Sequence, residues 1–257
     1  MGRREGNDCM DYKNPENKDL LQNKIEELLS EYQGLFDALI NNPDSYKKSA
    51  LLYYWLRDYK NYLINEDTFS PNFYPSFQKG NIVNVNLGFN LGSEMGGLHY
   101  AIVLANSNRK NPNIVIAPLT SIKPGKNLST LRPTEMAIGE ELFSMIKGKH
   151  TALKTSIPTE LKLLEAAAVD KSNIEAFRQR ADELLKKLDL LEKTMKKLQV
   201  LKHGSIIVLN QIRTVSKMRI SDPTDKYDIL YDLKLSSKTL DSLDERLAKL
   251  YLNVLDK

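Results

Sequence analysis

The sequence lacks most of the residues that would indicate disulfides, a metal centre or a membrane span. Its 257 residues include one cysteine, Cys9, which has no second thiol to pair with, and three histidines at positions 99, 150 and 203. These four residues lack the close spacing of zinc ligands. No apolar run approaches the roughly 18 residues of a membrane span, and residues 1–18 lack a signal-peptide core. The composition predicts a reduced, cytoplasmic protein with no metal, no cofactor and no membrane partner.

Charge gives only a mild indication of what the protein binds. The 37 basic and 33 acidic residues leave a net charge of +4, and the isoelectric point is about 8.9. A small positive excess favours a nucleic-acid partner without identifying one. The length allows one or two domains, and the pattern along the chain favours two.

Residues 1–77 are predicted to form an N-terminal helical extension. Apolar residues recur at helical spacing over residues 20–40, and the segment 41–45 carries the stop and capping signals before a second helix that ends near residue 64. Aromatic and basic residues alternate along this second helix. Such a stripe can stack nucleic-acid bases, but we interpret it as packing surface. Residues 66–77, with two prolines, read as a linker.

The next segments have the pattern of a small β-sheet. Residues 82–87 alternate apolar and polar side chains, which is the period of a half-buried strand. Short apolar runs follow at 100–104, 114–119 and 206–209, the last opened by His203-Gly204-Ser205, and residues 133–138 are a further candidate strand. The loop 88–97 contains four glycines, whose wide backbone freedom suits a mobile flap.

Four motifs in this region resemble, in their order, the PemK/MazF family of toxin endoribonucleases. The matching segments are Lys79-Gly80-Asn81-Ile82, Gly92-Ser93-Glu94-Met95-Gly96-Gly97, Ala117-Pro118-Leu119-Thr120-Ser121 and Asn210-Gln211-Ile212-Arg213-Thr214-Val215. The resemblance implies an α+β fold: a small SH3-like β-barrel of the PemK/CcdB type, made of residues 78–139 and 203–257, with a closing C-terminal helix near 236–255. Residues 140–202 would then be a helical insertion.

The insertion carries a coiled-coil-like pattern of apolar residues. The predicted seam runs through Phe177, Ala181, Leu184, Leu188, Leu191, Met195 and Leu198. With a start at Pro158-Thr159 and a stop at His203-Gly204, it predicts one helix of up to about 40 residues. A helix of that length needs a partner, which could be the N-terminal helices, the same insertion in a second subunit, or a different protein. We interpret its lysine pairs as a solvated face, although they could contact phosphate.

The resemblance also implies a reaction and the residues that perform it. Metal-independent RNA cleavage needs a base for the ribose 2′-hydroxyl, an acid for the leaving oxygen, and charge or donors on the phosphate. The family's flap arginine, strand threonine and flap serine or histidine correspond to the candidate catalytic residues His99, Thr120 and Ser93. Candidate RNA-binding residues are Lys79, Glu94, Asn210, Gln211, Arg213 and Arg219.

Three of these positions depart from the family pattern. His99 stands for the arginine, so it can transfer a proton where arginine supplies fixed charge. Asn210 replaces an acid and cannot accept a proton, and Tyr100 replaces a proline. A purely structural role stays open for His99 and Thr120, as does ion pairing for the two arginines.

The hypothesis from the sequence is an endoribonuclease toxin that cuts single-stranded mRNA and inhibits growth. Unpaired bases suit a shallow protein groove, because only they expose their edges and faces. The resemblance further implies a cognate antitoxin and a homodimer whose groove crosses the subunit boundary. Two alternatives remain: a non-catalytic binding protein acting on a protein target such as gyrase, and a self-inhibited interaction module whose long helices replace the antitoxin.

Overall fold

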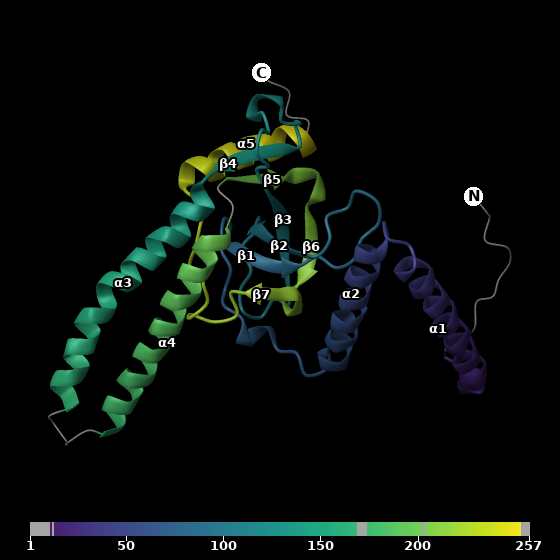
Figure 1. The fold of residues 1–257 in the computed structure, drawn as a ribbon, viewed down its shortest axis with the longest axis horizontal. Helices are drawn as coiled ribbons and strands as arrows, with labels where there is room; N and C mark the ends of the chain where they lie inside the picture. Colours follow the sequence, from purple (N-terminus) through teal and green to yellow (C-terminus); the bar gives the residue numbers. More distant parts are fainter. Residues whose placement is uncertain (1–10, 12, 169–173, 202–203, 253–257) are drawn as a thin grey trace. The chain divides into compact units, whose positions relative to one another are not determined.

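The computed structural model describes residues 11, 13–168, 174–201 and 204–252 (Figure 1). Cys9 and His203 lie outside the described residues. His203 is part of the predicted helix stop at His203-Gly204. Contacts between residues divide the chain into two compact units, Met1–Asn61 and Tyr62–Lys257. No helix in the described ranges is long and apolar enough to cross a membrane.

The first unit contains the two helices expected from the apolar periodicity. They are α1, Lys18–Ile40, and α2, Tyr46–Asn65, whose last four residues belong to the second unit. Asn41 ends α1, with its side-chain amide donating to the carbonyl of Asp37 at 2.8 Å. None of the residues of α1 is buried, and α2 buries only Ser49 and Leu52. The interpretation of the α2 aromatic stripe as packing surface is therefore wrong within the described chain for its exposed members, Tyr46, Tyr53, Tyr54 and Tyr59.

The second unit is built on an antiparallel sheet of seven strands within the described residues. The strands are β1 Ile82–Asn86, β2 Leu98–Val103, β3 Asn113–Ser121, β4 Glu135–Gly139, β5 Ser205–Val208, β6 Arg213–Ser216 and β7 Ile220–Asp222. Their order is β4-β5-β3-β2-β1-β7, and β6 also pairs with β3. The long strand β3 thus pairs with β2 and β6 along its first part and with β5 at its end. The predicted α+β fold class is confirmed.

Both faces of this sheet are covered, because side chains alternate between them. One face carries the barrel core, formed by Phe77, Val83, Val85, Leu87, Ala101, Val103, Ile114, Ile116, Val215 and Ile220. The other carries the helix-side core, which includes Ile82, Ile102, Ala117, Leu119, Ile207 and Leu209 together with residues of two helices. Neighbouring residues such as Ile82 and Val83 belong to different cores, so this part of β1 has apolar side chains on both faces of the sheet.

The insertion is a hairpin of two helices packed on each other. These helices are α3, Glu141–Ala168, and α4, Ile174–Val200 (Figure 1). The hairpin is held by a hydrogen bond between His150 Nδ1 and Thr194 Oγ1, 3.0 Å long, and by an ion pair between Lys187 and Glu160 at 2.6 Å. The predicted helix start at Pro158 is wrong, because Pro158 lies inside α3. The partner that α4 needs is α3, which was not among the expected candidates.

The buried face of α4 differs from the predicted seam. Leu184 is buried as predicted, but Leu188 and Met195 are exposed, and Leu190 and Thr194 are buried. Thr194 tolerates burial because its hydroxyl donates to the carbonyl of Leu191 at 2.8 Å and also meets His150.

A C-terminal helix closes the helix-side core, as predicted. This helix, α5, spans Ser237–Tyr251, and Ser236 caps it by accepting from the backbone of Thr239. Leu243 is fully buried in the helix-side core. The Tyr251 hydroxyl donates to the carbonyl of Leu209 at 2.6 Å, which ties the end of α5 to the segment that follows β5. Leu255 of the predicted helix lies outside the described residues.

Candidate nucleic-acid interface

His99 and Thr120 lie on neighbouring strands and on the same face of the sheet. The register of β2 and β3 pairs Ala101 with Pro118, and two further residues along that register would set His99 opposite Thr120. Both are half-buried, at the edge of the barrel core. The His99 ring contacts the β3 backbone directly, with Nδ1 3.1 Å from the carbonyl oxygen of Leu119. A carbonyl can only accept, so Nδ1 donates the hydrogen, and in the neutral tautomer of this arrangement Nε2 is the acceptor.

The flap is the connection between β1 and β2, and its backbone folds back on itself. Gly97 N donates to the carbonyl of Gly88 at 2.7 Å, and the Asn90 side-chain amide donates to the carbonyl of Met95 at 2.6 Å. Gly96 is required at its position, because a Cβ there would lie 2.6 Å from the carbonyl oxygen of Gly88. The flap is therefore a closed turn that starts and ends beside His99.

Gln211 connects this flap to one of the candidate arginines. Its side-chain oxygen accepts from the backbone of Met95 at 3.2 Å and from Arg213 Nη2 at 2.9 Å. Arg213 opens β6 opposite Ile116, a residue of the barrel core. Opposed residues of a ladder point to the same face, so Arg213 shares the face of His99 and Thr120. The predicted RNA contact Gln211 thus holds the flap and the guanidinium of Arg213 at once, a role that the sequence does not reveal.

Arg219 adds a second positive charge at the base of the flap. Its Nε donates to the carbonyl of Asn86, the last residue of β1, at 2.8 Å, and Asn86 pairs with Leu98, the neighbour of His99. Burial lowers the pKa of the Arg219 guanidinium, and the nearby charge of Arg213 lowers it further. Two guanidinium groups close enough to repel each other form a place where an anion is stabilised.

The remaining predicted residues lie away from this cluster or at its edge. Ser93 and Glu94 are exposed on the turn of the flap, and Asn210 is exposed one residue before Gln211. Lys79 precedes β1, whereas the flap follows it, so the five residues of β1 separate the two by roughly 15 Å. The Lys79 ammonium is paired with Asp244 of α5. His99 contacts the backbone beside Thr120, Gln211 joins Arg213 to the flap, and Arg219 lies at the base of the flap, whereas Lys79 lies apart.

A buried polar cluster that the sequence did not indicate lies on the opposite face of β2. The Lys197 ammonium of α4 sits 4.8 Å from the ring centre of Tyr100, whose buried hydroxyl has no hydrogen-bond partner among the described residues. Burial raises the pKa of Tyr100, and Lys197 opposes this shift. The insertion therefore docks on the residue next to His99. The replacement of the family's proline by Tyr100 was the one available signal.

Two further groups of this cluster are titratable. Burial raises the pKa of Asp222 to about 6, against the hydrogen bond from the backbone of Leu230 and the attraction of Lys149 and Lys197. Lys149 of α3 donates to three backbone carbonyls, those of Asp228, Ile229 and Tyr231, at 2.8–3.1 Å. Burial lowers the pKa of Lys149. One ammonium thus fixes the loop between β7 and α5 to the helical hairpin.

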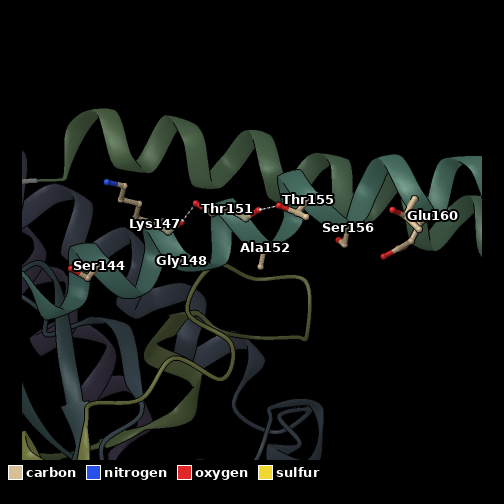
Figure 2. Close-up of a pocket in the computed structure, with 9 residues that line it drawn as sticks. Ser144, Lys147, Gly148, Thr151, Ala152, Thr155, Ser156 and Glu160 are labelled. Atoms are coloured by element: carbon tan, nitrogen blue, oxygen red, sulfur yellow. Dashed lines mark hydrogen bonds between the residues drawn. The ribbon is translucent and has the colours of Figure 1, made fainter.

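A large cavity of the second unit lies elsewhere, along α3 (Figure 2). It is an open groove with a volume of about 1020 Å³, lined along one face of α3 from Ser144 to Glu160 by small residues together with the charged Lys147 and Glu160. The hydroxyls of Thr151 and Thr155 donate to carbonyls one turn earlier in the same helix, each at 3.0 Å. None of the predicted site residues lines this groove. In the described ranges, no cluster of three or more histidine, cysteine or acidic side chains is arranged to hold a metal ion.

Comparison with known protein families agrees with the motifs. Residues 78–199 match the family of PemK-like, MazF-like toxins of type II toxin-antitoxin systems, which is just under half of the chain. The match spans β1 to β4 and the helical hairpin, and ends before β5. Strands β5 and β6 pair with β3 of the matched region, so the sheet includes both parts. No curated protein matches the chain significantly. Over residues 78–199, the chain is therefore similar to PemK-like, MazF-like toxins of type II toxin-antitoxin systems.

Proposed function

We propose that the protein is a metal-independent endoribonuclease toxin that cleaves single-stranded mRNA. The observation that supports this most is that His99, Arg213 and Arg219 all adjoin the flap, in a domain whose sequence matches the toxin family. Half-buried polar groups beside a glycine-rich turn suit an unpaired RNA strand, whose bases can be splayed out.

His99 is the proposed base of the reaction. Its Nε2 takes the proton of the ribose 2′-hydroxyl, O2′ attacks phosphorus, and the bond from phosphorus to O5′ breaks. The hydrogen bond from Nδ1 to the Leu119 carbonyl holds the ring in the tautomer that this step requires. The proton returns to the leaving O5′, which gives a 2′,3′-cyclic phosphate and a 5′-hydroxyl end.

Arg213 and Arg219 are proposed to stabilise the charge that develops on the phosphate. Hydrogen bonds fix both side chains, that of Arg213 to Gln211 and that of Arg219 to the carbonyl of Asn86. The guanidinium groups therefore need little reorientation when the phosphate binds. Thr120, on the same face as His99, is placed to donate its hydroxyl to a phosphate oxygen. Ser93, Glu94 and Asn210 on the exposed turns would contact flanking nucleotides and determine sequence preference.

The test is cleavage of a defined RNA by purified variants. We expect His99→Ala to remove cleavage while the circular dichroism spectrum is preserved, and His99→Arg to retain part of it, because an arginine fills this position in the family. His150→Ala is a matched control, since this histidine bonds to Thr194 within the hairpin. Full activity of His99→Ala would refute the role. Added chelator should leave the rate unchanged, and complete dependence on magnesium would count against a metal-free mechanism.

A second candidate function is binding without cleavage, for example to a protein such as gyrase. The observation that favours it is Asn210, a neutral and exposed residue where the family has an acid. The two functions can be distinguished by expressing the unchanged chain and the double variant His99→Ala, Thr120→Ala and comparing their toxicity and their RNA products. Loss of toxicity together with loss of cyclic-phosphate ends supports the nuclease, whereas toxicity that persists with intact RNA supports a protein target.

We also propose a homodimer and a cognate antitoxin, both implied by the family. A groove shared by two subunits would give each RNA strand two flaps, related by a two-fold axis. Light scattering of the purified chain tests the dimer. The antitoxin is tested by co-expressing the protein encoded by a neighbouring gene. It should restore growth and co-purify with the chain.

A further inference from the structure

Helix α2 presents three tyrosines to solvent on a single face. Tyr46, Tyr53 and Tyr54 are exposed by 62%, 54% and 51%. At 100° per residue these three side chains, with Arg57 and Lys60, fall within about 120° of the helix circumference. The stripe formed by these five residues, here called the tyrosine face, lies on the first unit of the chain, outside the residues that match the toxin family.

The charge of α2 complements a polyanion. The helix carries four basic residues, Lys47, Lys48, Arg57 and Lys60, and one acidic residue, Asp58. Asp58 is paired with Arg57 at 2.9 Å. Lys60 is exposed on the tyrosine face, and Lys47 and Lys48 are exposed beside Tyr46 at the start of the helix. Phosphates that follow the helix would meet a cation near each end of the tyrosine face.

The side chains on this face are of the kinds on which nucleobases stack. The Tyr53 and Tyr54 rings meet edge to face, with centroids 5.4 Å apart, and the Arg57 guanidinium lies over Tyr54 at 5.0 Å. Flat rings flanked by cations are the platform on which single-stranded nucleic acids stack.

We propose that the tyrosine face of α2 is a second binding surface for single-stranded RNA, separate from the candidate site at the flap. Tyr46 and the Tyr53–Tyr54 pair are two turns apart, roughly 10 Å along the helix, which leaves room for bases stacked at both. The surface holds RNA by stacking and by phosphate contacts, so it is tolerant of sequence. It takes no part in bond breaking.

The test measures binding of the full chain to a 20-nucleotide, 2′-O-methylated RNA labelled with fluorescein. This probe cannot be cleaved through its 2′ oxygen, so its binding is read whether or not the protein is a nuclease. We expect Tyr53→Ala and Tyr54→Ala each to weaken binding roughly tenfold, and Tyr53→Phe to retain it because the ring remains. Lys60→Gln should lower the slope of log affinity against log salt by about one unit.

A control within the same helix is Tyr59→Ala. Tyr59 is also exposed, but its ring stacks on Trp55, with centroids 5.5 Å apart, away from the tyrosine face. We expect this variant to bind RNA as the unchanged chain does. Equal weakening by Tyr59→Ala would overturn the proposal, because the effect would not belong to the tyrosine face.

The outcome is independent of the nuclease proposal. Tyr53→Ala should lose affinity for the methylated probe and keep cleavage of a six-nucleotide RNA. If Tyr53→Ala and Tyr54→Ala both bind the long probe normally, the tyrosine face does not bind RNA and a protein partner becomes the alternative. That result would leave the role of His99 unaffected.

Discussion

The two units of this chain use apolar residues in opposite ways. In the second unit most apolar side chains of the strands are buried, as Ile82, Ile102 and Ile207 show. In the first unit α1 carries leucines and isoleucines at similar density and buries none of them. Hydrophobic periodicity therefore reports that a helix has an apolar face. It does not report whether the same chain covers that face.

The largest effect that can test this comparison is a cavity in the barrel domain. Ile207 is fully buried in the helix-side core, so Ile207→Ala should lower the free energy of unfolding of the second unit by about 2–5 kcal/mol. The side chain of Leu28 on α1 is half exposed, so Leu28→Ala should change the free energy of unfolding of the first unit by less than about 0.5 kcal/mol. Hydrogen exchange of peptides from each unit measures both values. Similar costs at the two positions would show that α1 is covered in solution.

The next effect concerns a carboxyl in the packed unit. Burial raises the pKa of Asp222 from 3.8 to about 6. Between these two pH values the Asp222 carboxyl keeps its proton in the native state and has lost it in the unfolded state. The stability from this group is complete below pH 3.8 and is lost as pH rises through about 6. Asp222→Asn should therefore equal the unchanged chain at pH 4 and exceed it at pH 8 by at most about 3 kcal/mol.

Urea denaturation at the two pH values measures this difference, and the exposed Asp37 of α1 provides a control. Asp37→Asn should give the same change, close to zero, at both pH values. A stability gap for Asp222→Asn that does not grow with pH would contradict the assignment.

The smallest effect is one substitution with opposite consequences in the two units. Gly34→Ala on α1 meets no atom within 4 Å and should stabilise the helix by roughly 0.5–1 kcal/mol. Gly96→Ala in the flap would bring Cβ to 2.6 Å from the Gly88 carbonyl and should cost roughly 1–3 kcal/mol. Thermal denaturation tests the first, and faster hydrogen exchange of residues 88–97 tests the second. Equal protection of the flap in Gly96→Ala would show that the turn accommodates the added Cβ without cost.

Local patterns were sufficient for the parts of the fold that depend on neighbouring residues. Alternation over residues 82–87 predicts β1, and the Ala117–Ser121 motif places Thr120 on β3, because strand period and turn residues act within a few positions. His99 was found through the motif, and its partner Leu119 follows from the strand register. The contact of Lys149 with three carbonyls could not be predicted, since the loop it holds is some 80 residues away in sequence.

The helical hairpin shows why the other predictions failed. A proline usually marks a helix start, but packing of α3 on α4 outweighs the one backbone hydrogen bond that Pro158 removes. Leucines surround α4 between residues 184 and 191, so several apolar seams fit the sequence equally well. The polar partner of Thr194, His150, selects the seam that is buried, and only the three-dimensional pairing reveals it.

Gln211 gives the flap a property that its glycines alone do not. One amide oxygen accepts from both the Met95 backbone and the Arg213 guanidinium, so a single side chain positions the turn and the cation together. The glycines act on the backbone of the turn alone, whereas loss of the Gln211 amide would disturb the turn and the guanidinium at once.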